Sequence, residues 1–276
     1  MSRFRFAATP AGAIGLVLLS FVLLVALAGP AFAPHPPGQT IGLPFAEPAH
    51  GTPLGLDVLG RDGLSRTLWG GRSVLGLAGT ATLLAYLAGA AIGLSSGYLA
   101  GPVDAFLMRG VDVFLSIPAL LFILLLITGA GTSNTTLVIA VAVVQAPLIA
   151  RVVRSATLEQ SVRAFVEAAV ARGERASAII TREIVPNIVP SVMADAGLRL
   201  TYSIILVASV NFFGLGLEPP AADWALMISE NRSGFNLNPW VIVAPAVMIA
   251  LLTISVNLVG DALARSLGRS DVRSEA

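Results

Sequence analysis

The chain has 276 residues, of which 55% belong to the hydrophobic set AVILMFWYC and 12% are charged. Its mean hydropathy is +0.84. A soluble domain carries roughly 25% charged residues, so this composition excludes a water-soluble globule and indicates an integral membrane protein. The absence of cysteine and lysine excludes disulfides, cysteine-ligated metals, a Schiff-base lysine and the lysine of a phosphate-binding loop. The net charge of +1 gives no sign of a nucleic-acid partner.

Runs without charged residues predict the helices that span the membrane, because a helix needs about 20 apolar residues to cross roughly 30 Å of hydrocarbon. This criterion predicts six helices. They are expected at about 11–31, at 74–99, twice between 112 and 151 with a turn at 131–136, from about 191 towards 218, and at 240–260. The chain is therefore expected to be an all-α membrane protein, and an even number of spans places both termini on one side.

The first predicted helix has two interpretations. Arg3 and Arg5 precede its apolar stretch, and Ala31-Phe32-Ala33 has the form of a signal-peptide cleavage site. The apolar stretch is longer than the roughly 7–15 residues usual in a signal peptide. An uncleaved anchor helix within a segment 1–33 is therefore favoured, and a cleaved signal peptide is the alternative.

The distribution of arginine predicts the orientation. With the N-terminus inside, the inner segments hold thirteen of the seventeen arginines and the outer segments hold four, in agreement with the positive-inside rule. Both termini, including a tail at 262–276, are therefore expected in the cytoplasm. The outer segment 34–73 contains Arg61 and Arg66 together with two aspartates, so ion pairs are expected within it.

Glycine and proline predict how the helices pack. Gly89, Gly93 and Gly97 recur every four residues in the second helix, so one face of it is smooth and allows another backbone to approach closely; a chance scatter of glycine is the alternative. Pro118 and Pro147 each remove a backbone donor within a span. They are expected to kink their helices, as hinges or as static bends.

The segment 151–190 is long and charged, yet its apolar residues recur at helical spacings on both sides of Gly173. A lone glycine between two helical stretches supplies the positive φ of a sharp turn. Pro186 and Pro190 are expected to end the second stretch. The pattern favours a compact helical protrusion that docks on a partner over a solvated tether between two spans.

At this point the sequence resembles a known family. The loop consists of Glu167-Ala168-Ala169, three residues, Gly173, nine residues, Glu183, Ile184, Val185 and Pro186. It is similar to the EAA loop of ABC importer permeases, whose pattern is EAA-x3-G-x9-I-x-L-P. Glu183 replaces the usual Ile and Val185 the usual Leu, while the Gly and the Pro that shape the turn are present.

Three further segments resemble dipeptide, oligopeptide and nickel permeases of the same class. They are residues 53–66 before the second helix, 112–118 in the third, and 211–220 with Trp224 after the fifth. Asn211 stands where the family usually has Ser, and Ala225 where it has Gly. The four matching segments follow the family order and extend over about residues 53–261.

The resemblance implies a type I importer permease fold, and specifically the shorter "C" partner of a heterodimeric pair. An anchor helix would precede a five-helix core, here 74–261, in the cell inner membrane. The implied partners are a second homologous permease, two ATPase subunits, an extracytoplasmic solute-binding protein and the lipid bilayer. ATP and magnesium would be bound by the ATPase subunits and no cofactor by this chain, which is not expected to be an enzyme. Dipeptides and oligopeptides are the favoured solutes, with nickel also open.

The resemblance also assigns residues. Those expected in the ATPase-coupling loop are Glu167, Ala168, Ala169, Arg172, Gly173, Arg175 and Pro186. Arg172 and Arg175 have a second interpretation as ordinary charges of the inner face. In the outer loop the candidates for contact with the binding protein or for an outer gate are Gly214, Gly216, Pro219, Pro220 and Trp224. Trp224 alternatively anchors the chain at the membrane surface.

The main rival is a secondary transporter driven by an ion gradient, a class that uses ionisable residues inside the membrane. Here the aspartates closest to the spans are all predicted at helix ends, namely Asp104, Asp112, Asp195 and Asp261. The uncharged polar residues predicted within spans, such as Gln145 and Ser203, are interpreted as helix–helix hydrogen bonds rather than as a solute site. A membrane enzyme would need clustered Asp, Glu, His or Ser in a span, and none is seen.

Overall fold

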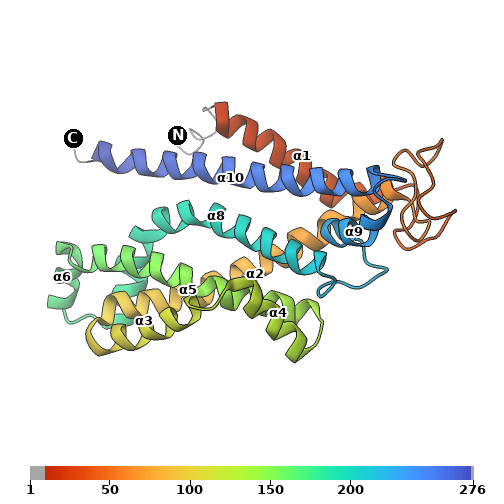
Figure 1. The fold of residues 1–276 in the computed structure, drawn as a ribbon. Coiled ribbons are helices and arrows are strands. Elements are labelled where there is room, and N and C mark those ends of the chain that lie inside the picture. Colours follow the sequence, from red (N-terminus) through yellow and green to blue (C-terminus); the bar gives the residue numbers. More distant parts are fainter. Residues whose placement is uncertain (1–9, 275–276) are drawn as a thin grey trace.

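A computed structural model describes residues 10–274 of the chain, with side chains as far as residue 266. Arg3 and Arg5 lie outside the described residues. The helices are α1 (Pro10–Phe32), α2 (Gly63–Leu99), α3 (Gly101–Leu115), α4 (Ala119–Ala130), α5 (Asn134–Ser161), α6 (Ala164–Ala171), α7 (Ala176–Ile179), α8 (Val185–Phe212), α9 (Trp224–Asn231) and α10 (Trp240–Ser274) (Figure 1). A π-helical turn at Ile180–Ile184 joins α7 to α8, and a 3₁₀ turn at Arg232–Gly234 follows α9.

Five helices of the described chain are long and apolar enough to cross a membrane by themselves, and α3 and α4 form a sixth candidate span. The prediction of an all-α membrane protein is thus confirmed. In the third span, where Pro118 was expected to kink the helix, α3 and α4 are separate helices that meet at an angle of 85°. Pro118 lies at the break, with φ −57°, and its ring excludes the backbone hydrogen bond that would continue α3.

The structure gives the helix ends near three predicted boundaries. Within the outer segment predicted at 34–73, α2 begins at Gly63, and Asp62 caps it by accepting hydrogen bonds from the backbone N–H groups of Leu64 and Ser65. The tail predicted at 262–276 is helical as far as Ser274, as a continuation of α10. Gly260 allows close approach, because an added Cβ would lie 3.0 Å from the Cα of Gly197 in α8.

The third boundary concerns Pro186 and Pro190, which do not end a helix. Pro186 lies in the first turn of α8 and Pro190 lies inside it. The π-helical turn at Ile180–Ile184 lies just before Pro186 and continues into α8. The side-chain amide of Asn187 donates to the backbone carbonyl of Glu183 at 2.6 Å. Residues 176–212 therefore form one continuous helical span.

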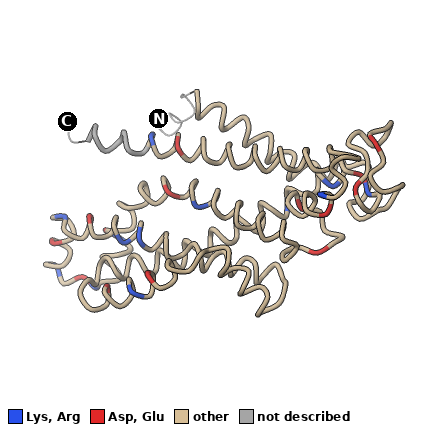
Figure 2. Tube along the Cα trace, viewed as in Figure 1, with Lys and Arg blue, Asp and Glu red and all other residues tan. Residues whose placement is uncertain are grey.

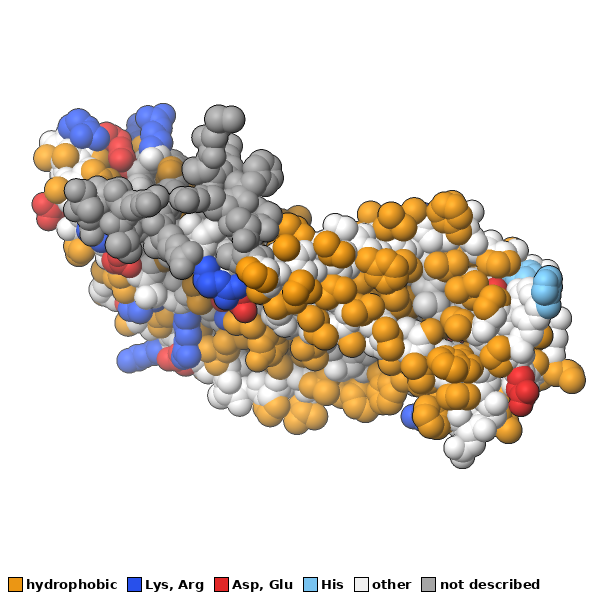
Figure 3. Space-filling model, turned by 90° about the horizontal axis from the view of Figure 1, so that it is seen from above, with side chains coloured by type: hydrophobic (Ala, Val, Ile, Leu, Met, Phe, Trp, Pro, Cys, Tyr) orange, Lys and Arg blue, Asp and Glu red, His pale blue; other side chains and the backbone are white. Residues whose placement is uncertain are grey.

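The bundle has two polar ends and an apolar middle. The segment between α1 and α2 lies with α9 at one end, whereas α6 and the last turns of α10 lie at the other (Figure 1). Charged residues concentrate towards both ends (Figure 2), and apolar side chains cover much of the surface between them (Figure 3). This division matches a protein whose middle is surrounded by lipid.

The contact between α2 and α5 is the most extensive between any two helices of the described chain. Gly89, Gly93 and Gly97 are all buried and all face α5. A Cβ added to Gly93 would lie 2.6 Å from the carbonyl oxygen of Ala150 and 2.7 Å from the Cβ of Val153. The two backbones therefore approach each other as closely as a small-residue face permits.

This contact gives the first prediction. Replacing Gly93 by alanine forces α2 away from α5, and overpacking of this kind costs about 1–3 kcal/mol. We expect a lower melting temperature for the detergent-solubilised G93A protein. The matched control is G79A in the same helix, where an added Cβ meets nothing within 4 Å. Equal melting temperatures for the two variants would contradict the assigned packing.

Candidate functional site

Within the predicted loop 151–190, α5 extends to Ser161 and α8 begins at Val185. We call residues 163–184 the helical protrusion. It consists of α6, a turn, α7 and the π-helical turn that leads directly into α8. In Figure 1 it extends from the end of the bundle opposite α9.

The turn of the protrusion is a complete Schellman motif centred on Gly173. The φ angle of Gly173 is +77°, as the sequence predicts. The N–H of Gly173 donates to the carbonyl of Val170 at 2.9 Å, and the N–H of Glu174 donates to the carbonyl of Ala169 at 3.2 Å. An added Cβ at Gly173 would meet no atom within 4 Å. The need for glycine here is therefore conformational and does not arise from crowding.

The inner side of the protrusion packs on the bundle. Val166, Ala169, Ile179 and Ile184 are buried, and they form one apolar cluster with residues of α5 and α8. Ala169 was predicted to touch a partner, but its exposed fraction is 0%, so it holds α6 against the bundle instead. This cluster fixes the orientation of the protrusion relative to the spans that flank it.

The outer side carries the residues available to another protein. Glu167 and Ala168 are exposed, as are the apolar side chains of Val162 (73%), Phe165 (36%) and Val170 (56%). Val162 and Val170 were not predicted as site residues. The signal that would find them is an apolar residue in a segment that is otherwise charged. An apolar patch of this kind outside the lipid-facing middle marks an interaction surface.

The two arginines of the protrusion have different surroundings. The Arg172 guanidinium donates through Nη2 to Glu174 at 2.7 Å and lies 3.8 Å from a carboxylate oxygen of Glu183, so it braces the turn. Arg175 is exposed and precedes α7 at its N-cap position. Pro186 lies beyond the protrusion, inside α8.

Two ion pairs join α3 to α5 near the protrusion. Arg154 binds both carboxylate oxygens of Asp104 at 2.6 Å, and Ser96 of α2 also donates to Asp104. Arg151 donates to Asp112 at 2.5 Å in a pair whose side chains are more than half exposed. The broken span is thereby tied to the helix that enters the protrusion.

The opposite end of the bundle is held by the outer charge cluster, which we define as Asp57, Arg61, Arg66 and Glu230. Arg61 donates to Asp57 at 2.6 Å and to Glu230 at 2.8 Å, and Arg66 donates to the same Glu230 oxygen at 2.8 Å. The side-chain exposures of the four residues range from 0% to 11%. The expected pairing of Arg61 and Arg66 with Asp57 is confirmed, whereas Glu230 was not anticipated.

Trp224 does not face outward as the sequence analysis expected. Its side chain is fully buried, it packs on Gly70 and Gly71, and its indole N–H donates to the carbonyl of Thr67 at 2.8 Å. Trp224 therefore cannot contact a binding protein directly. The preceding Asp223 caps α9, and burial raises the pKa of this carboxyl while hydrogen bonds from Ser73 and two backbone N–H groups oppose that rise.

The other outer-loop candidates are split between surface and interior. Pro219 and Pro220 are exposed, and Gly214 lies in the turn after α8 with φ +72°. Gly216 is buried against Asn211, whose side-chain oxygen accepts from the N–H of Leu217 at 3.0 Å. Only the exposed members of this set are placed where a partner can reach them.

Comparison with known proteins identifies the family. Residues 89–270 match the family model described as "Binding-protein-dependent transport system inner membrane component". The chain belongs to this family. It is therefore a multi-pass membrane protein of the inner membrane and a transporter permease subunit, not an enzyme.

Three relatives of this permease are described as peptide or glutathione permeases. The dipeptide transport system permease protein DppC of Alkalihalophilus pseudofirmus is 30% identical over 259 residues, which cover 92% of this chain and 84% of the relative. The glutathione transport system permease protein GsiD of Pectobacterium atrosepticum is 36% identical over 214 residues, which cover 78% of this chain and 71% of the relative. The oligopeptide transport system permease protein OppC of Haemophilus influenzae is 31% identical over 274 residues, which cover 97% and 87%.

Solved structures show the fold. The inward-facing MetNI methionine ABC transporter matches this permease with a TM-score of 0.58 at 18% identity, over 72% of this chain and 94% of that one. An amino acid ABC transporter matches with a TM-score of 0.51 at 20% identity, over 72% and 90%. The fold is that of type I ABC importer permeases, as the sequence predicts.

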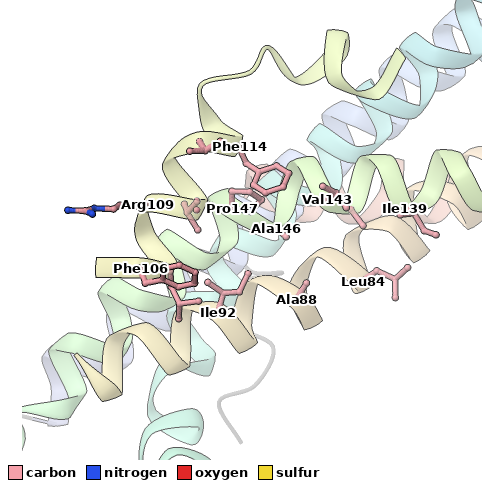
Figure 4. Close-up of a pocket in the computed structure, with 15 residues that line it drawn as sticks. Leu84, Ala88, Ile92, Phe106, Arg109, Phe114, Ile139, Val143, Ala146 and Pro147 are labelled. Carbon is pink, nitrogen blue, oxygen red and sulfur yellow. The ribbon is translucent and has the colours of Figure 1, made fainter. Parts of the chain in front are cut away.

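A groove with a volume of about 830 Å³ lies between α2, α3 and α5 (Figure 4). Apolar side chains such as Ile92, Phe106 and Val143 line it, and Arg109 points away from it at its margin. This lining offers few groups that could bind a polar solute. Within the described residues no group of three or more His, Asp or Glu side chains is arranged to hold a metal.

The outer charge cluster gives the second prediction. Replacing Glu230 by glutamine leaves two buried guanidinium groups with one carboxylate, and breaking a buried pair costs about 3–5 kcal/mol. We expect a marked loss of thermal stability, measured by tryptophan fluorescence, to which the buried Trp224 contributes. E47Q, at an exposed glutamate of the same outer segment, is the control and should melt like the wild type. Unchanged melting of E230Q would show that the cluster does not stabilise the fold.

Proposed function

We propose that this permease is the "C" half of a heterodimeric translocation unit in an ATP-driven, binding-protein-dependent importer of dipeptides or oligopeptides. A second homologous permease completes the unit, two ATPase subunits bind beneath it, and an extracytoplasmic binding protein delivers the solute. ATP and magnesium belong to the ATPase subunits. Both termini and the helical protrusion face the cytoplasm.

Support for the solute class comes from the relatives. Their descriptions name glutathione, oligopeptide and dipeptide transport, and the chain aligns with OppC over 97% of its length. All three solute classes are peptides, with amide bonds and charged groups. A peptide importer is thus favoured over a nickel importer.

The observation that carries the proposal is the rigid continuity between the helical protrusion and the spans. This chain has no lysine and therefore no phosphate-binding loop of the usual type, so energy must enter through contact with another subunit. The buried cluster around Val166 and Ala169 fixes α6 to α5 and α8, and the exposed Phe165, Ala168 and Val170 provide the contact surface.

Mechanically, closure of an ATPase dimer would push the protrusion, and α5 and α8 would follow as rigid bodies. Rigid-body movement of this kind alternates access to a path at the middle of the membrane. The coupling is reciprocal: if nucleotide favours one state of the permease, solute loading must alter the affinity for nucleotide.

An ion-gradient-driven transporter is the alternative, and one observation favours it. Asp195 was predicted at a helix end but lies inside α8, where it is paired with Arg199. Uptake of a labelled peptide into proteoliposomes separates the two functions. Uptake that requires ATP and persists with an uncoupler supports the proposal, and uptake that follows an ion gradient without ATP overturns it.

The turn of the protrusion gives the third prediction. G173V should abolish ATP-driven uptake, because a β-branched residue resists a positive φ and the protrusion loses its shape. G173N is the matched control, since asparagine tolerates this conformation and the space around the residue is open. ATPase activity of the assembled complex should become independent of solute in G173V only. Normal uptake by G173V would refute the coupling role.

The orientation gives the fourth prediction. Because the chain has no cysteine, single engineered cysteines report unambiguously. A176C, at an exposed position of the protrusion, should crosslink to an ATPase subunit and resist an impermeant reagent added to intact cells. E47C in the outer segment should react with that reagent. The reverse accessibility would invert the proposed topology.

A further inference from the structure

One face of α8 is left uncovered by the other helices. Leu198, Tyr202, Ile205 and Phe212 are exposed by 46%, 49%, 46% and 38%. Their spacing of four, three and seven residues places them on one side of the helix. We call these four residues the α8 face. It combines apolar side chains with a phenol in a segment long enough to span the membrane.

An ion pair borders this face. Asp195 lies three residues before Leu198 and seven before Tyr202, which places it on the same side of α8. Its carboxylate accepts from Nε of Arg199 at 2.9 Å and from Nη2 at 3.0 Å, and the hydroxyl of Tyr86 in α2 donates to it at 3.0 Å. The two charged side chains keep 12% and 11% of their surface exposed.

The pair lies level with the middle of α5, one of the candidate spans. The side-chain amide of Gln145 donates to the backbone carbonyl of Arg199 at 2.8 Å and to the hydroxyl of Ser203 at 2.9 Å. Gln145 belongs to the long run without charges that forms α4 and α5, and it is buried in α5. Thr82 of α2 extends the same polar contact to Ser203 at 2.8 Å. Arg199 is therefore at the depth of the middle of α5.

Lipid is an unfavourable neighbour for such a face. Ionisable residues inside a membrane face the interior of a bundle or a water-filled cavity, and they mark the pathways of solutes. Asp195 and Arg199 keep a small exposed surface beside the uncovered helix face, where water or a polar ligand can reach them. The lining of the groove between α2, α3 and α5 contains no such pair.

We infer that the α8 face borders the aqueous translocation path and that Asp195 and Arg199 contact the charged ends of the passing peptide. This inference rests on the proposed import of peptides. A peptide presents an ammonium group, a carboxylate and amides, and the pair offers one partner for each charge. Because the pair is neutral as a whole, it can exchange partners without holding the peptide tightly, as passage through a path requires.

Cysteine labelling tests the position of the α8 face without any assumption about the solute. In the assembled, reconstituted importer, L198C, Y202C and I205C should react with a negatively charged methanethiosulfonate reagent. F21C and L24C on α1 are controls of at least equal exposure, with values of 50% and 62%, and they should react much more slowly. Rates at α8 that equal those at α1 would place the face against lipid, and no labelling at α8 in any nucleotide state would place it against another helix. Either result overturns the inference.

Peptides with blocked ends test the pair itself. D195N should raise the KM for a dipeptide with a free amino group severalfold and leave the KM for the N-acetylated dipeptide unchanged. R199Q should raise the KM for a dipeptide with a free carboxylate severalfold and leave the KM for the C-terminally amidated dipeptide unchanged. D195E should restore the wild-type KM. Equal effects on free and blocked peptides would reduce the pair to a structural role and overturn the ligand assignment.

The failure of this inference differs from the failure of the proposed function. If the wild-type importer takes up peptides with ATP but the α8 cysteines behave like the α1 controls, the path lies elsewhere and the proposed function stands. If the wild type takes up no peptide while the α8 cysteines are labelled, the path is correctly placed but the solute class is wrong, and the assignment of Asp195 and Arg199 to peptide ends is refuted.

Discussion

The apolar contact between α6 and the inner ends of α5 and α8 is the constraint on which the proposed coupling depends. Val166 and Ala169 of α6 are buried against the same cluster as Ile184 and Ile188 at the start of α8. Two helices joined only by a flexible turn would absorb a push from outside, because each could rotate about its own end. Here the buried apolar side chains hold α6 against the bundle, and the Schellman hydrogen bonds fix the turn. The protrusion is thus held in a fixed orientation relative to α5 and α8. Force applied to its exposed surface must therefore move the spans.

The opposite end of the molecule is fixed by a different interaction. The outer charge cluster joins the segment before α2 to α9, and Trp224 packs on the glycines of the first turns of α2. Between the two ends, the close α2–α5 contact through Gly89, Gly93 and Gly97 forms the stable part of the bundle. Hydrogen bonds attach α8 to α2 and α5 through Ser203, Thr82 and Gln145. Such bonds permit small displacements of a helix more readily than the close backbone contact between α2 and α5 does.

The sequence predicted those features that depend on local periodicity or on one special residue. The spans follow from charge-free runs, the turn from Gly173, and the smooth face of α2 from glycines at four-residue intervals. It failed where contacts between distant residues decide. Glu230 and Arg66 are 164 positions apart, so no local pattern joins them, and the burial of Trp224 depends on a helix that lies far earlier in the chain. Pro186 misled the prediction because the helix continues through it by way of the π-helical turn at Ile180–Ile184, which the sequence pattern does not reveal.

The ion pairs at the two ends of the molecule differ in how much water surrounds them. The cluster around Arg61 is almost completely desolvated, whereas the side chains of Arg151 and Asp112 are 54% and 59% exposed. Mobile ions screen exposed charges over a Debye length of about 8 Å at physiological ionic strength, and they screen buried pairs much less. Salt therefore weakens the outer charge cluster little. Of the two ion pairs that join α3 to α5, Arg151–Asp112 is the more exposed and weakens more as the salt concentration rises, whereas Arg154–Asp104, with side chains 31% and 20% exposed, continues to hold the broken span.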